Sequence, residues 1–256
     1  MGLEYVKTLL DPSRTHASST IIACCRSPST ATALHEYMNN HLSPDQKDRI
    51  HIQELDITND DHIASLAKFI EEKYNRVDAL FNVAGVLGDS KTTPGPERNI
   101  TKFDRKWFQS QMDVNAIGPM MLTQALMPFM KVSRKELKEE TRAPSVVVNM
   151  SARVASIADN EGGLGWHSYR MSKAALNSGN RTLAHELGRS GIWTVALYPG
   201  FTDTDMSVPF QAKGMKEKGL VFPVDFTVGR MLDVVENMDE KHSGGLYDWS
   251  GIALPF

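Results

Sequence analysis

Residues 145–150 read Ser-Val-Val-Val-Asn-Met, and residues 193–198 read Trp-Thr-Val-Ala-Leu-Tyr. Both are short, nearly uninterrupted apolar runs, as expected of strands that are buried on both faces. Such strands are typical of a parallel sheet that is covered by helices on either side, so these two segments decide the class of fold. Further strands are expected at 19–25, 50–57, 77–83 and 245–249.

Helical patterns separate these strands along the chain. Helices are expected at 2–10, 30–41, 60–73, 102–131, 168–176 and 223–237, with polar loops at 87–99 and 133–142. This alternation predicts an α/β fold with a doubly wound, Rossmann-type parallel sheet and right-handed crossovers. Because no shift in composition marks a boundary, we expect residues 1–256 to form a single domain.

The composition is that of an ordinary globular protein. Of 256 residues, 41% are hydrophobic and 23% are charged, and the net charge of −3 shows no bias toward nucleic acid or anionic membranes. No apolar run approaches a membrane span, and the N-terminus does not resemble a secretory signal. Cys24 and Cys25 are adjacent, which suits neither a disulfide nor a metal site. We therefore expect a cytoplasmic protein without a metal.

Residues 168–176 read Ser-Tyr-Arg-Met-Ser-Lys-Ala-Ala-Leu and favour a helix. The four-residue spacing of Tyr169 and Lys173 places both side chains on one face. A neighbouring ammonium favours the phenolate, so the pKa of Tyr169 is expected below its usual value of about 10. Such a phenol could protonate a carbonyl oxygen or deprotonate an alcohol. An ordinary amphipathic helix would also explain this pair taken alone.

Ligands of doubly wound sheets bind beyond the carboxyl ends of the strands, so the residues there are informative. Arg26 follows one strand, where a cation would accommodate the 2′-phosphate of NADP, although a solvent-facing arginine fits equally well. Asp56 follows the next strand and could also cap a helix. Asn82, Ala84 and Gly85 end a third strand, where small residues let a ligand approach the backbone.

Polar residues also accompany the later strands. Ser151 follows the strand at 145–150, where a hydroxyl could stabilise an oxyanion. Asn115 lies inside a helical pattern, where asparagine is mildly unfavourable. Pro199 and Gly200 end the strand at 193–198 and predict a sharp turn. Each of these signals is weak by itself.

Six motifs, taken together and in order, resemble the classical short-chain dehydrogenase/reductase family. They are Leu-Asp-Ile-Thr (55–58), Asn-Val-Ala-Gly (82–85), Asn-Ala-Ile-Gly-Pro (115–119), Asn-Met-Ser (149–151), Tyr-Arg-Met-Ser-Lys (169–173) and Pro-Gly-Phe-Thr-Asp-Thr (199–204). The match runs from residue 2 to the C-terminus. The segments around 151–157, 162–170 and 248–256 are similar to the sniffer-type carbonyl reductases and C-factor-like proteins.

The resemblance implies an NADP(H)-dependent carbonyl reductase or alcohol dehydrogenase that acts on a small molecule, with NAD as the less favoured cofactor. Tyr169 would be the acid/base, Lys173 would hold the nicotinamide ribose, Asn115 would anchor a proton-relay water and Ser151 would bind the carbonyl oxygen. The implied cofactor-binding residues are Arg26, Asp56, Ile57, Asn82, Ala84, Gly85, Tyr169, Lys173, Pro199, Gly200 and Thr204.

The start of the chain departs from the family pattern. The family opens with a strand and a Thr-Gly-x-x-x-Gly-x-Gly loop that receives the cofactor pyrophosphate, and Gly2 matches the last glycine of that loop. We therefore expect a chain that is truncated at its N-terminus and lacks the central strand of the sheet, which leaves two neighbouring strand edges unpaired or forces them together. The alternative function is then that of a non-catalytic member, either a cofactor-free interaction protein or an inactive fragment.

Two further departures concern the site and the assembly. Family members usually carry Ser-Ser after the strand and use the second serine, which is Ala152 here, so Ser151 is the candidate and Ser156 the runner-up. The family also forms homodimers or homotetramers, commonly through the helix that carries the tyrosine. Residues 177–180 (Asn-Ser-Gly-Asn) make that helix unusually polar.

Overall fold

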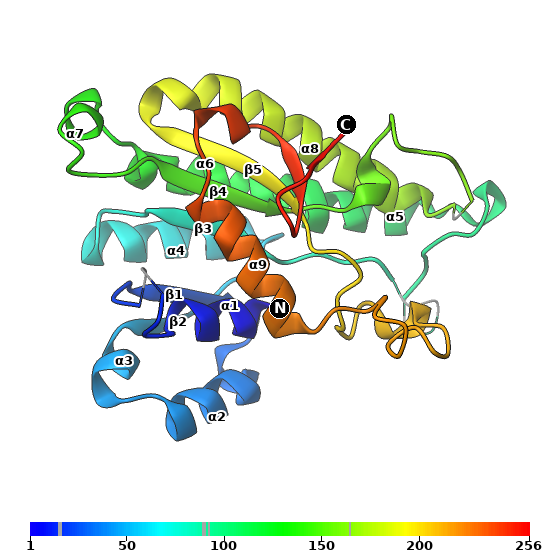
Figure 1. Ribbon diagram of the computed structural model, residues 1–256, viewed down its shortest axis with the longest axis horizontal. Coiled ribbons are helices and arrows are strands. Elements are labelled where there is room, and N and C mark those ends of the chain that lie inside the picture. Colours follow the sequence, from blue (N-terminus) through cyan, green and yellow to red (C-terminus); the bar gives the residue numbers. More distant parts are fainter. Residues whose placement is uncertain (15–16, 89–90, 92, 164) are drawn as a thin grey trace.

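The computed structural model describes residues 1–14, 17–88, 91, 93–163 and 165–256, and its strands and helices alternate as the sequence predicts (Figure 1). The helices are α1 (Gly2–Leu9), α2 (Thr32–His41), α3 (Pro44–Asp48), α4 (Asp60–Lys73), α5 (Arg105–Met112), α6 (Gly118–Met130), α7 (Arg134–Lys138), α8 (His167–Leu187) and α9 (Val224–Glu236). The strands are β1 (Ile21–Cys25), β2 (Ile50–Glu54), β3 (Ala79–Asn82), β4 (Ser145–Met150), β5 (Ile192–Tyr198), β6 (Leu246–Asp248) and β7 (Ala253–Leu254).

The strands form two sheets. β1 pairs in parallel with β2, and the other strands form a five-stranded sheet in the order β3-β4-β5-β6-β7, with only β7 antiparallel. The predicted α/β fold with a parallel sheet is therefore confirmed. Within the described residues, β1 pairs only with β2 and β3 only with β4, so the facing edges of the two sheets stay apart. Figure 1 shows β1 and β2, together with α2 and α3, below the larger sheet.

The larger sheet is buried on both faces, as its apolar strands predicted. Val147 and Val148 are neighbours on β4 and are both fully buried, but they belong to opposite core clusters. Val147 packs with apolar residues of α4 and α6, and Val148 packs with those of α1 and α9. Alternation along an extended strand places consecutive side chains on opposite faces, which produces these two layers of helices.

The structure divides or adds to the predicted elements at several points, among them β7 and the extension of α8 to Leu187. The expected helix 102–131 is divided into α5 and α6 by a π-helical turn at Asp113–Ile117. The expected loop 133–142 contains α7, because Ser133 and Glu136 form a capping box that satisfies the first backbone N–H groups. A second capping box, at Ser43 and Gln46, starts α3, which the sequence pattern did not predict.

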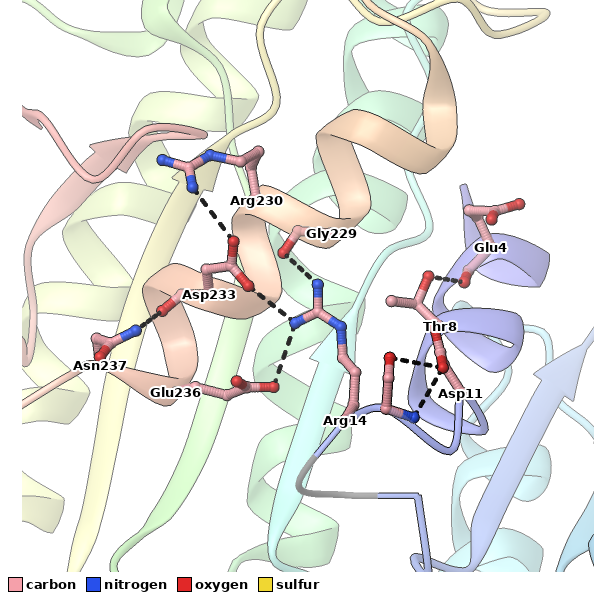
Figure 2. Close-up of polar contacts among 10 residues, drawn as sticks. Glu4, Thr8, Asp11, Arg14, Gly229, Arg230, Asp233, Glu236 and Asn237 are labelled. Atoms are coloured by element: carbon pink, nitrogen blue, oxygen red, sulfur yellow. Dashed lines mark hydrogen bonds and ion pairs between the residues drawn. The ribbon is translucent and has the colours of Figure 1, made fainter.

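An arginine joins the segment after α1 to α9 (Figure 2). Arg14 donates from Nη1 to Asp233 Oδ1 at 2.9 Å and to Glu236 Oε1 at 3.4 Å, and from Nη2 to the Gly229 carbonyl at 3.2 Å. Because α1 carries the buried Tyr5 into the core beneath the sheet, these contacts hold the first helix of the chain against the last.

A row of buried amides crosses the interior. Asn82 on β3 donates to Asn149 on β4 at 2.8 Å, and Asn149 donates to Asn180 on α8 at 3.0 Å. All three side chains are at most 3% exposed. The polar character of residues 177–180 is therefore explained by contacts inside this chain, because Asn177 also accepts a hydrogen bond from Ser151.

Candidate active site

The predicted pair lies on one buried face of α8. Tyr169 is 8% exposed and Lys173 is 3% exposed, which is unusual for a lysine without a carboxylate partner. Lys173 Nζ donates to the Met150 carbonyl at 2.7 Å, at the carboxyl end of β4. The two groups that decide the proposed chemistry are thus brought to the edge of the sheet where ligands bind in this class of fold.

Gly85 lies close to Lys173 of this pair. A Cβ atom at Gly85 would lie 3.2 Å from Asn115 Oδ1 and 3.3 Å from Lys173 Nζ. Any larger residue would therefore fill the position that the lysine and the asparagine share with the backbone after β3. The lack of a side chain therefore lets the backbone after β3 lie close to Lys173 and Asn115. A role of Gly85 toward a ligand stays a prediction.

Asn115 connects the segment after β3 to α8. Its side chain accepts a hydrogen bond from the Val86 N–H and donates to the Val86 carbonyl, both at 2.8 Å, and Nδ2 also donates to Ser172 Oγ at 3.0 Å. Ser172 donates in turn to the carbonyl of Tyr169 at 2.9 Å. Asn115 sits in the π-helical turn, a distortion that is frequent at functional sites. Its predicted part in a proton relay stays a prediction.

The predicted lowering of the tyrosine pKa is wrong for the structure described here. Burial raises the pKa of Tyr169 above its ordinary value, and the nearby Tyr198 raises it further. The physical reason is that desolvation disfavours the phenolate, and Lys173 does not offset that effect. The Tyr169 hydroxyl forms no hydrogen bond with another described residue, so it is free to meet a ligand.

Burial has the opposite consequence for the lysine: it lowers the pKa of Lys173 from 10.5 to about 8. Between these values the unfolded chain binds more protons than the folded one, so the free energy of unfolding rises with pH. At about 1.4 kcal/mol per pKa unit, we expect a gain of roughly 3 kcal/mol over this window. Chemical denaturation between about pH 8 and pH 10 should show this gain as the difference between the wild type and a variant that lacks the lysine.

The control for this prediction is Lys173→Met, which keeps an unbranched side chain but removes the titrating group. Above about pH 9 its free energy of unfolding should fall, because burial raises the pKa of the Cys24 thiol from 9.0 to about 12. The wild type shares this fall, so the contribution of Lys173 is the difference between the two curves. The range stops near pH 10 because burial also raises the pKa of Tyr5 and Tyr169, and their ionisation in the unfolded chain lowers stability above that point. If the free energy of unfolding changes with pH in the same way in the wild type and the variant, the lowered pKa of Lys173 is contradicted.

The candidate serines differ in their contacts. Ser151 is buried, and its hydroxyl donates to Asn177 Oδ1 at 2.6 Å. Ala152, the next residue, packs with Leu87 in the apolar cluster that contains Tyr169. Ser156 accepts a hydrogen bond from the Asp159 N–H at 3.0 Å. The role of Ser151 stays a prediction, and it requires the serine hydroxyl to exchange its acceptor, Asn177 Oδ1, for a substrate oxygen.

The remaining predicted cofactor residues fall into two groups. Arg26 and Asp56 lie together beyond β1 and β2, because Cys25 and Glu54 are paired at the ends of these strands. Hydrogen bonds from Thr58 lower the pKa of Asp56, and the positive charge of Arg26 lowers it further. Asp56 is not the cap of α4, since Asn59 accepts the hydrogen bonds from its first turn. These two charges stand where the sequence predicted an adenosine site.

Other predicted residues have clear packing roles. Ile57 is 9% exposed and lies in the core cluster beneath α4, and Asn82 belongs to the amide row. Gly200 adopts a φ of +74°, and a Cβ there would lie 2.9 Å from Trp249, so glycine is required by both backbone and space. Ala84, Pro199 and Thr204 also follow the ends of β3 and β5. The structure therefore brings these residues to one edge without testing their role toward a cofactor.

Sequence reasoning missed several residues that support the site. Ser172 links Asn115 to the tyrosine backbone, and Asn177 holds Ser151. Glu97, from the loop before α5, accepts hydrogen bonds from Ser168 at the start of α8. The pairing with Glu97 spans 71 positions, so no local pattern could have revealed it.

The described residues contain no cluster of three or more His, Cys, Asp or Glu side chains that could hold a metal ion. Among the same residues, no helix combines the length and the apolar character that a membrane span requires.

Comparison with known proteins identifies the class to which this fold and site belong. A family model described as short chain dehydrogenase matches residues 2–214. The chain therefore belongs to the short-chain dehydrogenase/reductase family, and it is an α/β oxidoreductase of the dehydrogenase/reductase type.

Individual relatives agree with this assignment. The C-signal protein of Myxococcus xanthus is 33% identical over 186 residues, which cover 70% of this chain and 93% of that protein. The carbonyl reductase Sniffer of D. melanogaster has a TM-score of 0.82 at 28% identity, and an NADPH-bound carbonyl reductase from chicken fatty liver has 0.82 at 29%. In both structural matches, all of this chain and 94% of the other chain are covered.

Proposed function

We propose that this protein is an NADP(H)-dependent carbonyl reductase, which also catalyses the reverse oxidation of an alcohol. The observation that carries the proposal is the buried Tyr169–Lys173 pair at the carboxyl end of β4, in which the phenol hydroxyl forms no hydrogen bond with another described residue. A buried phenol that faces a cleft can deliver a proton to a developing alkoxide, and water is excluded around it.

The residues of the site divide the work as follows. Tyr169 donates its hydroxyl proton to the substrate oxygen in the reductive direction and takes it back in the oxidative direction. Ser151 donates a hydrogen bond to the same oxygen once its hydroxyl turns from Asn177 Oδ1 to the substrate. Lys173 supplies a buried positive charge, which stabilises negative charge that develops on the phenol oxygen. Asn115 holds the backbone of Val86, in the segment after β3, in place.

NADPH, when bound, supplies the hydride. Two features suit such a cofactor: Lys173 uses only one of its donors on Met150, and the lack of a side chain at Gly85 keeps the backbone after β3 close to the lysine ammonium. We propose that Lys173 holds the nicotinamide ribose and that Arg26 meets the 2′-phosphate of the adenosine. The chicken carbonyl reductase, which was solved with NADPH, supports this preference by similarity.

The cofactor proposal is tested with Arg26→Ala. Loss of one exposed cation on a phosphate should raise the KM for NADPH by about tenfold, equivalent to about 1.4 kcal/mol, and leave the KM for NADH within about twofold. The measurement is the oxidation of each cofactor, followed by absorbance with a panel of aldehydes, ketones and quinones. Arg189→Ala, which removes another exposed arginine, is the control. Equal changes for both cofactors would contradict the preference.

Binding and turnover of the unaltered chain come first. A fluorescence titration with NADPH should saturate, and NADPH should be consumed with at least one carbonyl compound of the panel. If neither occurs, the alternative of a non-catalytic family member replaces the present proposal.

The serine assignment is tested by a matched pair of variants. Ser151→Ala should lower kcat by about 10²-fold, since it removes one donor to the oxygen that gains charge. Ser156→Ala should change kcat by less than about threefold, because that hydroxyl accepts from Asp159 at the start of a turn. Steady-state kinetics with NADPH saturating gives both values. A loss that appears only in Ser156→Ala would move the role to Ser156.

Three further expectations from the sequence stay predictions: the cytoplasmic location, the homodimer or homotetramer, and a small-molecule carbonyl or alcohol as the substrate. The apolar and aromatic side chains that pack around Tyr169 favour a substrate with a hydrophobic part; they are Val154, Trp166, Tyr198 and Phe210.

A further inference from the structure

The helix that carries Tyr169 begins without a cap of its own. The residue before its first turn is Trp166, whose side chain accepts no hydrogen bond from the helix and whose backbone lies in the left-handed region, with φ 57° and ψ 40°. A bulky residue is rarely found in that region, and the first N–H groups of a helix need partners from elsewhere. The start of α8 therefore depends on contacts from other parts of the chain.

Glu97 provides those contacts. Its carboxylate is 3% exposed and accepts hydrogen bonds from the Ser168 N–H at 3.3 Å and from the Ser168 hydroxyl. Ser168 itself is fully buried. A buried carboxylate is costly unless it is well paired, and the positive end of a helix is a favourable partner. The carboxylate thus does for α8 what a local cap would do in other helices.

The backbone of Glu97 takes part as well. The Trp166 N–H donates to the Glu97 carbonyl at 2.5 Å. Gly165 has a φ of +72°, and a Cβ there would lie 2.5 Å from the same carbonyl oxygen. The chain that enters α8 is therefore pressed against residue 97 by both a hydrogen bond and close packing.

Tyr169 follows Ser168 directly and is held on its other side by Ser172, which donates to the tyrosine carbonyl and accepts from Asn115. The tyrosine is thus placed between two anchors that come from outside α8, one at Glu97 and one at Asn115. The anchor at Asn115 also fixes Val86, so both anchors connect the segments after β3 to the helix.

We propose that Glu97 is a positioning residue for the reaction. By holding the first turn of α8 through Ser168, it sets the position of the Tyr169 hydroxyl relative to the substrate oxygen. This inference rests on the proposed function of Tyr169. Glu97 lies in the loop between β3 and α5, so this loop contacts α8 directly. A change in the position of the loop should therefore change the position of the Tyr169 hydroxyl.

The test compares Glu97→Ala with Glu97→Gln. Glu97→Ala removes both acceptors and should lower kcat by about 10²-fold, the effect of a misplacement of about 1 Å, while the KM for NADPH changes by less than about threefold. Glu97→Gln retains one acceptor oxygen and should recover kcat to within about tenfold of the wild type. Ser168→Ala removes only the hydroxyl, so its kcat should lie between those of Glu97→Ala and Glu97→Gln.

The cap of another helix, α4, serves as the matched control, with kcat measured at saturating NADPH. Asn59 caps α4 by accepting from the Asp61 and His62 N–H groups, so Asn59→Ala removes a comparable interaction. It should lower the thermal midpoint as Glu97→Ala does, with kcat of the folded protein unchanged. Equal losses of kcat in the two variants, or a kcat for Glu97→Ala within twofold of the wild type, would overturn the proposal.

Hydrogen exchange separates this inference from the proposed function. Glu97→Ala should speed the exchange of the amides at 168–170, and Asn59→Ala should not. If the wild type reduces a carbonyl compound and Tyr169→Phe does not, a wild-type kcat in Glu97→Ala refutes only the positioning role. If the wild type is inactive with every carbonyl compound, the proposed function fails, and the positioning role fails with it.

Discussion

Phenylalanine in place of Tyr169 is expected to lower kcat by about 10³-fold or more, within the range that general acid catalysis contributes. The substitution removes only the hydroxyl oxygen, which forms no hydrogen bond with another described residue. The ring keeps its packing against Leu87 and Ala152 in the apolar cluster. Folding and NADPH binding should therefore survive, and the loss should fall on the chemical step.

The measurement is NADPH oxidation at saturating cofactor and substrate, with circular dichroism and an NADPH titration to show that the variant is intact. Tyr198→Phe is the matched control, because Tyr198 lies in the same cluster and burial raises its pKa too. The control should retain turnover within about threefold. A Tyr169→Phe variant that keeps more than about a tenth of the wild-type kcat would refute the acid/base role.

Methionine in place of Lys173 should lower kcat/KM by about 10³-fold. Two effects combine: the ribose of the cofactor loses charged hydrogen bonds worth about 1.5–3 kcal/mol each, and the phenol loses a cation that favours its ionised form. The Met150 carbonyl also loses its partner, since Lys173 Nζ lies 2.7 Å from it. Unlike the tyrosine variant, this one should bind NADPH more weakly.

The two variants are distinguished by the Kd for NADPH. It should be unchanged in Tyr169→Phe and raised by about tenfold or more in Lys173→Met. Lys173→Arg keeps the charge in a longer and planar group, so it should restore part of the binding but little of the turnover. If Lys173→Met binds NADPH as the wild type does, the lysine has no part in holding the cofactor.

The sequence predicted the fold where a local pattern coincides with burial on both faces of a strand. β4 and β5 are the clearest cases, because Val147, Val148, Val195 and Leu197 are fully buried and the apolar runs reflect that. The π-helical turn around Asn115 could not be predicted, since its residues suit an α-helix equally well and the distortion depends on contacts with Val86 and α8.

Prediction of the site had a similar limit. Tyr169 and Lys173 could be placed together because helical spacing alone brings them to one face. The predicted direction of the Tyr169 pKa shift was wrong, because this shift depends on how deeply the phenol is buried. The spacing of two residues along a helix does not reveal their burial. The contact between Glu97 and Ser168 joins distant segments, so only the folded chain reveals it.

The row of buried amides has a consequence for how the sheet is assembled. Asn82 and Asn149 are directly opposite each other in the pairing of β3 with β4, and Asn149 reaches Asn180 only from this alignment. A slip of one residue would turn an amide to the other face of the sheet and strand its partners in an apolar interior, at a cost of about 1–3 kcal/mol for each group. These three side chains therefore favour one register of β3 against β4. They also fix the position of α8, which carries Tyr169 and Lys173, relative to the strands.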